Sequence, residues 1–254
     1  MLPTITVFGR TIAMYGLMIT LGIIMGVMIA IIRRSKYNIS KDDVIFSSCY
    51  GGIGLVVGAK LLFIITIIPT IIANWNFIMS DISLLNEALS KGFVFYGGLI
   101  GAVIGFYIYS RIYKIDFMML IDLMAPSIPI IHGIGRMGCF FAGCCYGMHY
   151  DGPFHLVFEH STVAPNGIPL FPIQIVECVF NIMAGILLIF YTRRQRKPGK
   201  AIGIYIIYYS IMRFLLEFLR GDISRGIVLN VSTSQLISIF LLPIGIYLFL
   251  KPKK

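Results

Sequence analysis

Long apolar segments separated by short polar connections dominate this sequence. A helix that crosses a bilayer needs about 20 mostly apolar residues, and such segments recur along the whole chain. Seven are found, at residues 11–32, 44–68, 93–110, 117–137, 172–191, 201–219 and 233–250. The sequence therefore predicts an all-α polytopic membrane protein, a bundle of seven transmembrane helices in a single domain 1–254.

The composition excludes an ordinary soluble fold. Charged residues make up 13% of the chain and hydrophobic residues 58%, whereas soluble domains carry about 25% charged residues. Only Arg10 precedes the first apolar segment, and no small-residue cleavage site closes that segment. We therefore expect it to stay in place as a helix and not to be removed as a signal peptide.

The basic residues predict the orientation of the chain. Runs of Lys and Arg follow the first, third, fifth and seventh apolar segments, and such runs favour the cytoplasmic side. The N-terminus is then outside and the C-terminus cytoplasmic, with a small head formed by the outer loops 69–91, 138–171 and 220–232. Clustered basic residues suit anionic lipid headgroups. Since no recognition motif accompanies the net charge of +10, we expect no nucleic acid partner.

Ionisable residues inside the predicted spans point to a functional site, because they are costly in a bilayer. Arg213, Glu217 and Arg220 are spaced to share one helix face. Lys60 and Arg136 also fall in the outer half of their segments, so four cations are predicted to converge on an anion, most simply a phosphate. An ion-pair network that only fixes helix register is the alternative, for Glu217 above all.

Glycines accompany these charges. The run 132–147 contains Gly135, Gly138 and Gly143, which predicts a loosened helix end whose backbone N–H groups could face an anion. Gly97 and Gly98 open another segment in a similar way. Together they indicate a headgroup-sized pocket that opens toward the outer leaflet. The four-residue spacing of most glycines in the first three segments also fits close helix packing.

Several motifs lie in one order along nearly the whole chain. They are Tyr15-Gly16-Leu17, Gly58-Ala59-Lys60, Tyr96-Gly97-Gly98-Leu99, Asp122 to Pro126, Gly135-Arg136-Met137-Gly138, Pro172-Ile173-Gln174 with Glu177, Arg213-Phe214, Glu217 to Arg220, and Ser234 to Ser238. At these residues the chain resembles the prolipoprotein diacylglyceryl transferases.

The resemblance implies a function. It implies transfer of the diacylglyceryl group from phosphatidylglycerol to the lipobox cysteine thiol of a prolipoprotein, in a bacterial inner membrane. The partners would be phosphatidylglycerol, the lipobox peptide and membrane lipid, and no cofactor motif is present. The residues implied as catalytic are Arg136, Arg213, Tyr96 and Cys139. Those implied as substrate-binding are Tyr15, Lys60, Gly97, Gly98, Gly135, Gly138, Glu177, Glu217 and Arg220.

Three positions depart from the family pattern. Tyr96 stands where the family usually has a histidine, Cys139 where it has an asparagine, and Cys144 and Cys145 lie where a polar stretch is usual. A tyrosine, with an ordinary pKa near 10, could orient a substrate or donate a proton, and His132 could serve as the base. A related transferase that uses cysteine chemistry on another acceptor, and a lipid or anion transporter, are the competing functions.

The five cysteines form two groups. Cys49 and Cys178 lie in apolar segments and are interpreted as small core residues. Cys139, Cys144 and Cys145 cluster in the predicted outer loop. They could form a disulfide, act as a nucleophile, bind a metal with His149, His155 or His160, or simply pack.

Overall fold

The computed structural model describes residues 3–7, 9–75, 83, 86, 89–90, 92–194, 197–222, 227–228 and 231–251. The chain forms two compact units. The hairpin unit is Asn38–Leu120, and the bundle unit combines Met1–Tyr37 with Ile121–Lys254.

The fold is mostly helical. In the described part of the chain, six helices are long and apolar enough to cross a membrane. They are α1 (Met14–Arg33, continued by the 3-10 helix Arg34–Tyr37), α2 (Lys41–Ala73), α5 (Phe95–Ile112), α8 (Ile173–Tyr191), α9 (Lys200–Leu216, continued by the 3-10 helix Glu217–Leu219) and α10 (Thr233–Leu250).

The predicted fourth span is broken. It consists of α6 (Phe117–Met124) and α7 (Ser127–Ala142), which meet at 41°. Pro126 lies at the break, where its missing N–H and fixed φ interrupt the helix. Counted as one span, the pair raises the number of candidate spans to seven. A polytopic membrane protein has this architecture.

Helix α8 has its polar residues inside and its apolar residues outside. Gln174, Glu177 and Asn181 are buried. The opposite face carries Val179, Met183, Leu187 and Phe190, each exposed by at least half of its surface. A soluble helix would place these two faces the other way round, so the exposed face of α8 suits contact with lipid.

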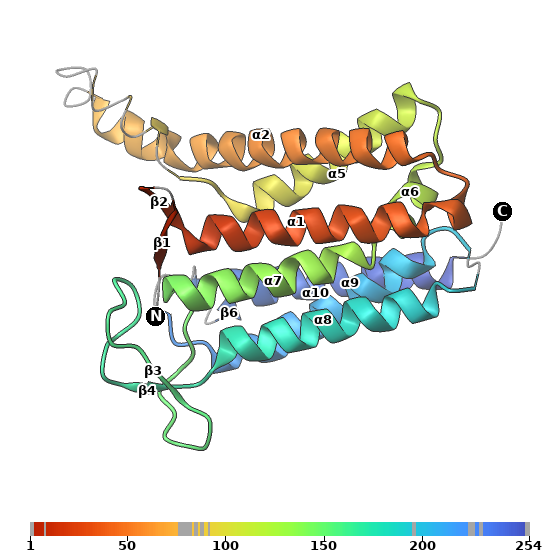
Figure 1. Cartoon of the computed structure of the whole chain (residues 1–254). Helices are drawn as coiled ribbons and strands as arrows, with labels where there is room; N and C mark the ends of the chain where they lie inside the picture. The colour runs from red at the N-terminus through yellow and green to blue at the C-terminus, as the bar shows by residue number, and fades with distance from the viewer. Residues whose placement is uncertain are drawn as a thin grey trace. The chain divides into compact units, whose positions relative to one another are not determined.

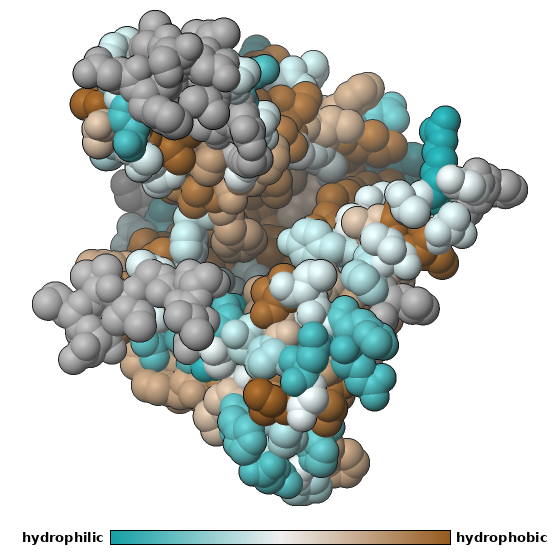
Figure 2. Space-filling model, turned by 90° about the vertical axis from the view of Figure 1, so that its left-hand side faces the viewer, coloured by the Kyte–Doolittle hydropathy of each residue, from teal (hydrophilic) through white to brown (hydrophobic). Residues whose placement is uncertain are grey.

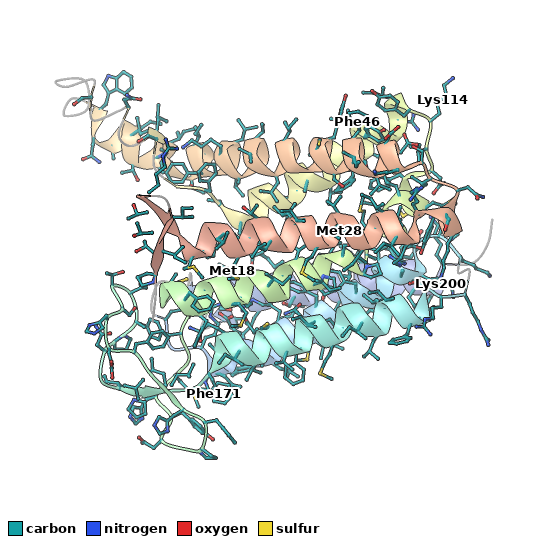
Figure 3. The ribbon with its side chains drawn as sticks, viewed as in Figure 1. Met18, Met28, Phe46, Lys114, Phe171 and Lys200 are labelled. Carbon is teal, nitrogen blue, oxygen red and sulfur yellow. The ribbon has the colours of Figure 1, made fainter. Side chains whose placement is uncertain are left out.

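Among the described residues, the bundle unit consists mainly of five long helices, together with the second half of α6. In Figure 1, α1, α7, α8, α9 and α10 run side by side, and α1 packs on α7, α7 on α8, and α9 on α10. Where α1 crosses α7, Ser127 Oγ donates a hydrogen bond to the carbonyl oxygen of Gly26 at 2.7 Å. Figure 3 labels Met18 between α1 and α7, Phe171 just before α8, and Lys200 at the opposite end of the unit.

Polar contacts fasten the Lys200 end of the bundle unit. The carboxylate of Asp122 accepts hydrogen bonds from the backbone N–H groups of Gly199 and Ile202, at 2.7 and 3.0 Å, and so caps α9. Arg33, the last residue of α1, donates to the Leu123 carbonyl oxygen at 2.6 Å and to Thr192 Oγ1 at 2.7 Å. These bonds connect α1, α6, α8 and α9 at a site where no catalytic residue was predicted.

The other end of the bundle unit carries a small head between α7 and α8. Strands β3 (Leu156–Val157) and β4 (Pro169–Leu170) pair in antiparallel fashion there, and Phe158, Ala164 and Leu170 form a buried apolar core. Figure 2 looks onto this end and shows hydrophilic residues gathered over these loops. Two short antiparallel hairpins, β1 (Thr4–Val7) with β2 (Arg10–Ala13) and β5 (Ile227–Val228) with β6 (Val231–Ser232), also belong to this unit.

The hairpin unit depends on glycine contacts between α2 and α5. A Cβ atom at Gly54 would overlap the backbone of Gly101, and one at Gly58 or Gly97 would overlap the other helix in the same way. Without side chains the two backbones can approach closely. The packing interpretation of these glycines is therefore correct.

Alanine substitutions on α2 test this packing. Gly54→Ala should destabilise the protein by about 1–3 kcal/mol, because the added methyl group overfills a backbone contact. Gly52 lies two residues away with open space around it. Gly52→Ala should leave the melting temperature in detergent unchanged or slightly raised, since alanine favours helix. Equal melting temperatures for the two variants would contradict the close α2–α5 contact.

Candidate active site

The carboxylate of Glu177 joins two guanidinium groups inside the bundle unit. Arg136 of α7 forms an ion pair through Nε with Glu177 Oε2. Arg213 of α9 contacts Glu177 Oε1 through Nη1 at 3.4 Å. The three side chains are between 5% and 11% exposed, so the pairing takes place almost out of solvent. The predicted convergence of the arginines from the fourth and sixth spans is confirmed.

Arg213 extends the network to two further residues. Its Nη2 atom lies 2.8 Å from Glu217 Oε2 and donates a hydrogen bond of 2.8 Å to Ser234 Oγ on α10. Both terminal nitrogens of Arg213 therefore contact protein groups, and the network connects α7, α8, α9 and α10.

Arg136 differs from Arg213 in this respect. It approaches Glu177 through Nε alone. Among the described residues, this pairing through Nε is the polar contact that its guanidinium group makes. Its two terminal nitrogens form the end of the guanidinium fork, the geometry that binds two oxygens of a phosphate or carboxylate. Arg136 is therefore the arginine of this cluster with a free edge for a ligand.

The prediction that the glycine-rich run loosens the helix is confirmed at Gly143, where α7 ends, but it is wrong at Gly135 and Gly138. Helix α7 continues through Gly133, Gly135 and Gly138 to Ala142. Helix α8 packs against it at Gly133, and α1 packs against it at Gly138. A Cβ atom at Gly138 would lie 3.2 Å from Met18 Cβ and 3.3 Å from Tyr15 Cδ2. Gly138 thus brings Tyr15 against α7, whereas Gly135 faces open space.

The predicted stripe of three charges along one helix face is also wrong at its third member. Regular helix ends at Leu216, and the backbone of Arg220 is extended, with φ −84° and ψ 141°. Arg220 donates instead to both carboxylate oxygens of Asp222, from Nε at 2.9 Å and from Nη2 at 2.6 Å. Burial would lower the pKa of Arg220, but these hydrogen bonds raise it above the ordinary value.

Tyr96, Lys60, Gly97 and Gly98 belong to the hairpin unit. Gly97 and Gly98 are buried against α2. The Lys60 ammonium lies 5.1 Å from the ring centroid of Phe63 and 5.2 Å from that of Phe93, within the range of a cation–π interaction. The Tyr96 ring packs edge-on against Phe95 at 5.7 Å. The roles predicted for these four residues stay predictions.

All five cysteines are free thiols, so the disulfide interpretation receives no support. Cys139 lies in α7 and not in a loop as expected, because the helix extends to Ala142. The Sγ atoms of Cys139, Cys144 and Cys145 lie within 4.8 Å of one another, and the described histidines are not part of this group. Cys178 is buried as expected, but Cys49 is exposed, so its core assignment is wrong.

Two further residues hold the site together. Ser234 receives the hydrogen bond from Arg213, and Gln174 Nε2 donates to the Cys144 carbonyl oxygen at 3.0 Å. Both residues lie in motifs that carried the family resemblance. They were not assigned to the site, because a neutral side chain does not stand out in an apolar segment as a charged one does.

An apolar cavity lies between α8 and α9, in the same unit. Its volume is about 260 Å³, and it is lined by residues that include Leu187, Leu188, Tyr205 and Tyr208. The hydroxyl of Tyr208 is buried without a hydrogen-bond partner among the described residues. A hydrocarbon chain is the kind of ligand that such a lining suits.

These observations define a polytopic membrane protein with a buried arginine–glutamate–arginine cluster. Residues 3–251 match the family model described as prolipoprotein diacylglyceryl transferase. The chain belongs to the prolipoprotein diacylglyceryl transferase family.

Curated relatives match the chain over almost its full length. A phosphatidylglycerol–prolipoprotein diacylglyceryl transferase of Clostridium tetani is 40% identical over 242 residues, which cover 95% of this chain and 94% of the relative. Transferase 2 of Clostridium perfringens is 38% identical over 243 residues, with 96% and 92% covered. The enzyme of Clostridium novyi is 31% identical over 249 residues, with 96% and 93% covered.

Replacing Glu177 tests the ion-pair cluster. Glu177→Gln removes the negative charge between two buried guanidinium groups, and breaking such a pair typically costs about 3–5 kcal/mol. We expect a lower melting temperature in detergent. The matched control is Glu159→Gln on the exposed surface of the head, which should melt like the parent protein. A Glu177→Gln variant as stable as this control would contradict a central role for the carboxylate.

Proposed function

We propose that this chain transfers the diacylglyceryl group of phosphatidylglycerol to the lipobox cysteine thiol of a prolipoprotein, the first step of bacterial lipoprotein maturation. Membership of the family and the names of the relatives support this assignment. The observation that carries it is the free edge of Arg136 beside the ion-paired Glu177.

The phosphate of the donor lipid would bind to the terminal nitrogens of Arg136. In the reaction, the acceptor sulfur forms a bond to the terminal glycerol carbon of the diacylglyceryl group. The bond from that carbon to the phosphate oxygen breaks, glycerol phosphate leaves, and the thiol loses its proton to a base. Negative charge grows on the phosphate, and a guanidinium already in position stabilises it without reorganisation.

Glu177 and Arg213 would position Arg136 in this mechanism. The carboxylate of Glu177 holds Nε, so the fork of Arg136 can face in only a few directions. Arg213 in turn fixes Glu177 from the other side, through contacts with Glu217 and Ser234. Both carboxylate oxygens of Glu177 are engaged by guanidinium groups, Oε2 by Arg136 and Oε1 by Arg213. Glu177 is therefore not the base that activates the thiol.

The apolar cavity between α8 and α9 is suited to an acyl chain of the donor. Its lining is apolar, and α8 turns an apolar face outward. An acyl chain could lie there with its headgroup near Arg136, because Glu177 and the cavity residue Leu187 share α8.

The orientation is part of the same proposal. The basic residues Arg33, Arg193 and Lys200 lie at the end of the bundle unit opposite to the head, where Lys36 Nζ also donates to the Arg193 carbonyl oxygen at 3.2 Å. We assign this end to the cytoplasm. Counting α6 and α7 as one span then places seven spans in the bacterial inner membrane, with the N-terminus and the head outside.

Rescue of a depleted strain tests the activity. The chain is expressed in bacteria depleted of their own transferase, and prolipoprotein modification is followed by the mobility shift of a reporter lipoprotein. Restored modification is expected. If the protein inserts at normal levels and the reporter stays unmodified, the proposed function is wrong.

Arg136→Ala tests the phosphate contact. Loss of one such donor lowers a transfer rate by about 10²- to 10³-fold, and we expect a loss of that size with the protein still inserted. Arg136→Lys should recover only part of the rate, because lysine keeps the charge without the fork. The control is Arg194→Ala, an exposed arginine near the Lys200 end, which should transfer normally. An active Arg136→Ala enzyme would remove the phosphate assignment.

A further inference from the structure

Three thiols meet where α7 ends, and the backbone explains why. Gly143 ends α7 in the left-handed region, with φ +68°. The Cys144 N–H group donates back to the Cys139 carbonyl oxygen at 3.1 Å, and the Gly143 N–H group to that of Phe140 at 3.2 Å. This helix-ending motif reverses the chain, so Cys144 and Cys145 return over Cys139.

Further contacts hold this arrangement. Gln174 of α8 donates to the Cys144 carbonyl oxygen at 3.0 Å. The backbone of Gly147 pairs with that of Arg220 in an antiparallel bridge, and Gly221 N–H donates to the Tyr146 carbonyl oxygen at 3.0 Å. Cys145 itself has φ +54°, a left-handed backbone conformation that few non-glycine residues adopt.

We propose that Cys139, Cys144 and Cys145 form a three-thiolate binding site for a soft or borderline d¹⁰ cation, of the class of Zn²⁺ and Cd²⁺. Their Sγ atoms lie within 4.8 Å of one another. Thiolates bound to zinc at about 2.3 Å in tetrahedral geometry are roughly 3.8 Å apart. A contraction of about one ångström at most would therefore close the site.

The charges around the cluster suit this ligand. Three thiolates and a divalent cation carry one net negative charge, and the arginines whose charges act on Cys145 are Arg136 and Arg220. Arg136 precedes Cys139 by three residues on α7, so the two side chains share a helix face. Binding releases the three thiol protons to solvent. Three thiolates leave the fourth coordination position of the cation open. Solvent can reach this position from the side of Cys144 and Cys145, which are partly exposed.

The site also has a consequence for the phosphate contact. Occupation of the cluster by the cation and three thiolates would add one negative charge beside Arg136. That charge would oppose binding of the phosphate to the terminal nitrogens of Arg136.

Cadmium binding to the purified full-length protein tests the site. The protein is reduced, freed of reductant without air and titrated with Cd²⁺, and the sulfur-to-metal absorption in the ultraviolet is recorded. We expect one Cd²⁺ per chain, and Zn²⁺ in excess should compete for the same site. Cys144→Ser and Cys145→Ser should each weaken binding at least tenfold. The matched controls are Cys49→Ser and Cys178→Ser, the two thiols outside the cluster, which should bind like the parent.

The titration also has outcomes that would overturn the proposal. One is full binding by the Cys144→Ser/Cys145→Ser double variant, checked for folding by size exclusion and thermal melting. Another is an equal loss of binding in the Cys49→Ser control. A third is loss of binding in His149→Ala, since this would assign the metal to the head and not to the three thiols.

Discussion

A carboxylate between two guanidinium groups organises the bundle unit. Glu177 alone would be costly inside an apolar bundle, and so would Arg136 or Arg213. Glu177 pairs with both arginines, and Glu217, which contacts Arg213, brings the sum of the four charges to zero. Because the three residues come from α7, α8 and α9, and Arg213 also reaches α10, one electrostatic requirement fixes how four helices lie around the candidate phosphate site.

The sequence was sufficient to predict a polytopic helical protein and to identify the charged members of this cluster. Seven apolar segments predicted the spans, because a bilayer sets both the length and the composition that a helix needs. Glu177, Arg136 and Arg213 could be identified because an ionisable residue inside an apolar segment is conspicuous and needs a partner. Which of them pair, and that Arg136 keeps a free edge while Arg213 does not, depends on side-chain geometry that spacing alone does not determine.

The errors have physical causes as well. Local propensity suggested that the glycines near Arg136 would loosen α7, but tertiary packing against Tyr15 and Met18 supports the helix there. Spacing placed Arg220 on a helix face with Glu217, but the helix ends first and Asp222 provides a nearer partner. The thiol cluster was visible as three cysteines, yet its compactness comes from a left-handed glycine at the helix end, which periodicity does not reveal.

The inside-out character of α8 bears on how the protein is made. A lone α8 entering the bilayer would expose the amides of Gln174 and Asn181 and the charge of Glu177 to hydrocarbon. Arg136, one partner of Glu177, is already present in α7, the preceding helix of the chain, but Arg213 is synthesised later. During co-translational insertion, α8 can thus leave the translocon for the lipid already paired with α7. Helix α9 then joins the pair through the contact of Arg213 with Glu177. The order of the helices along the chain is also a workable order of membrane assembly.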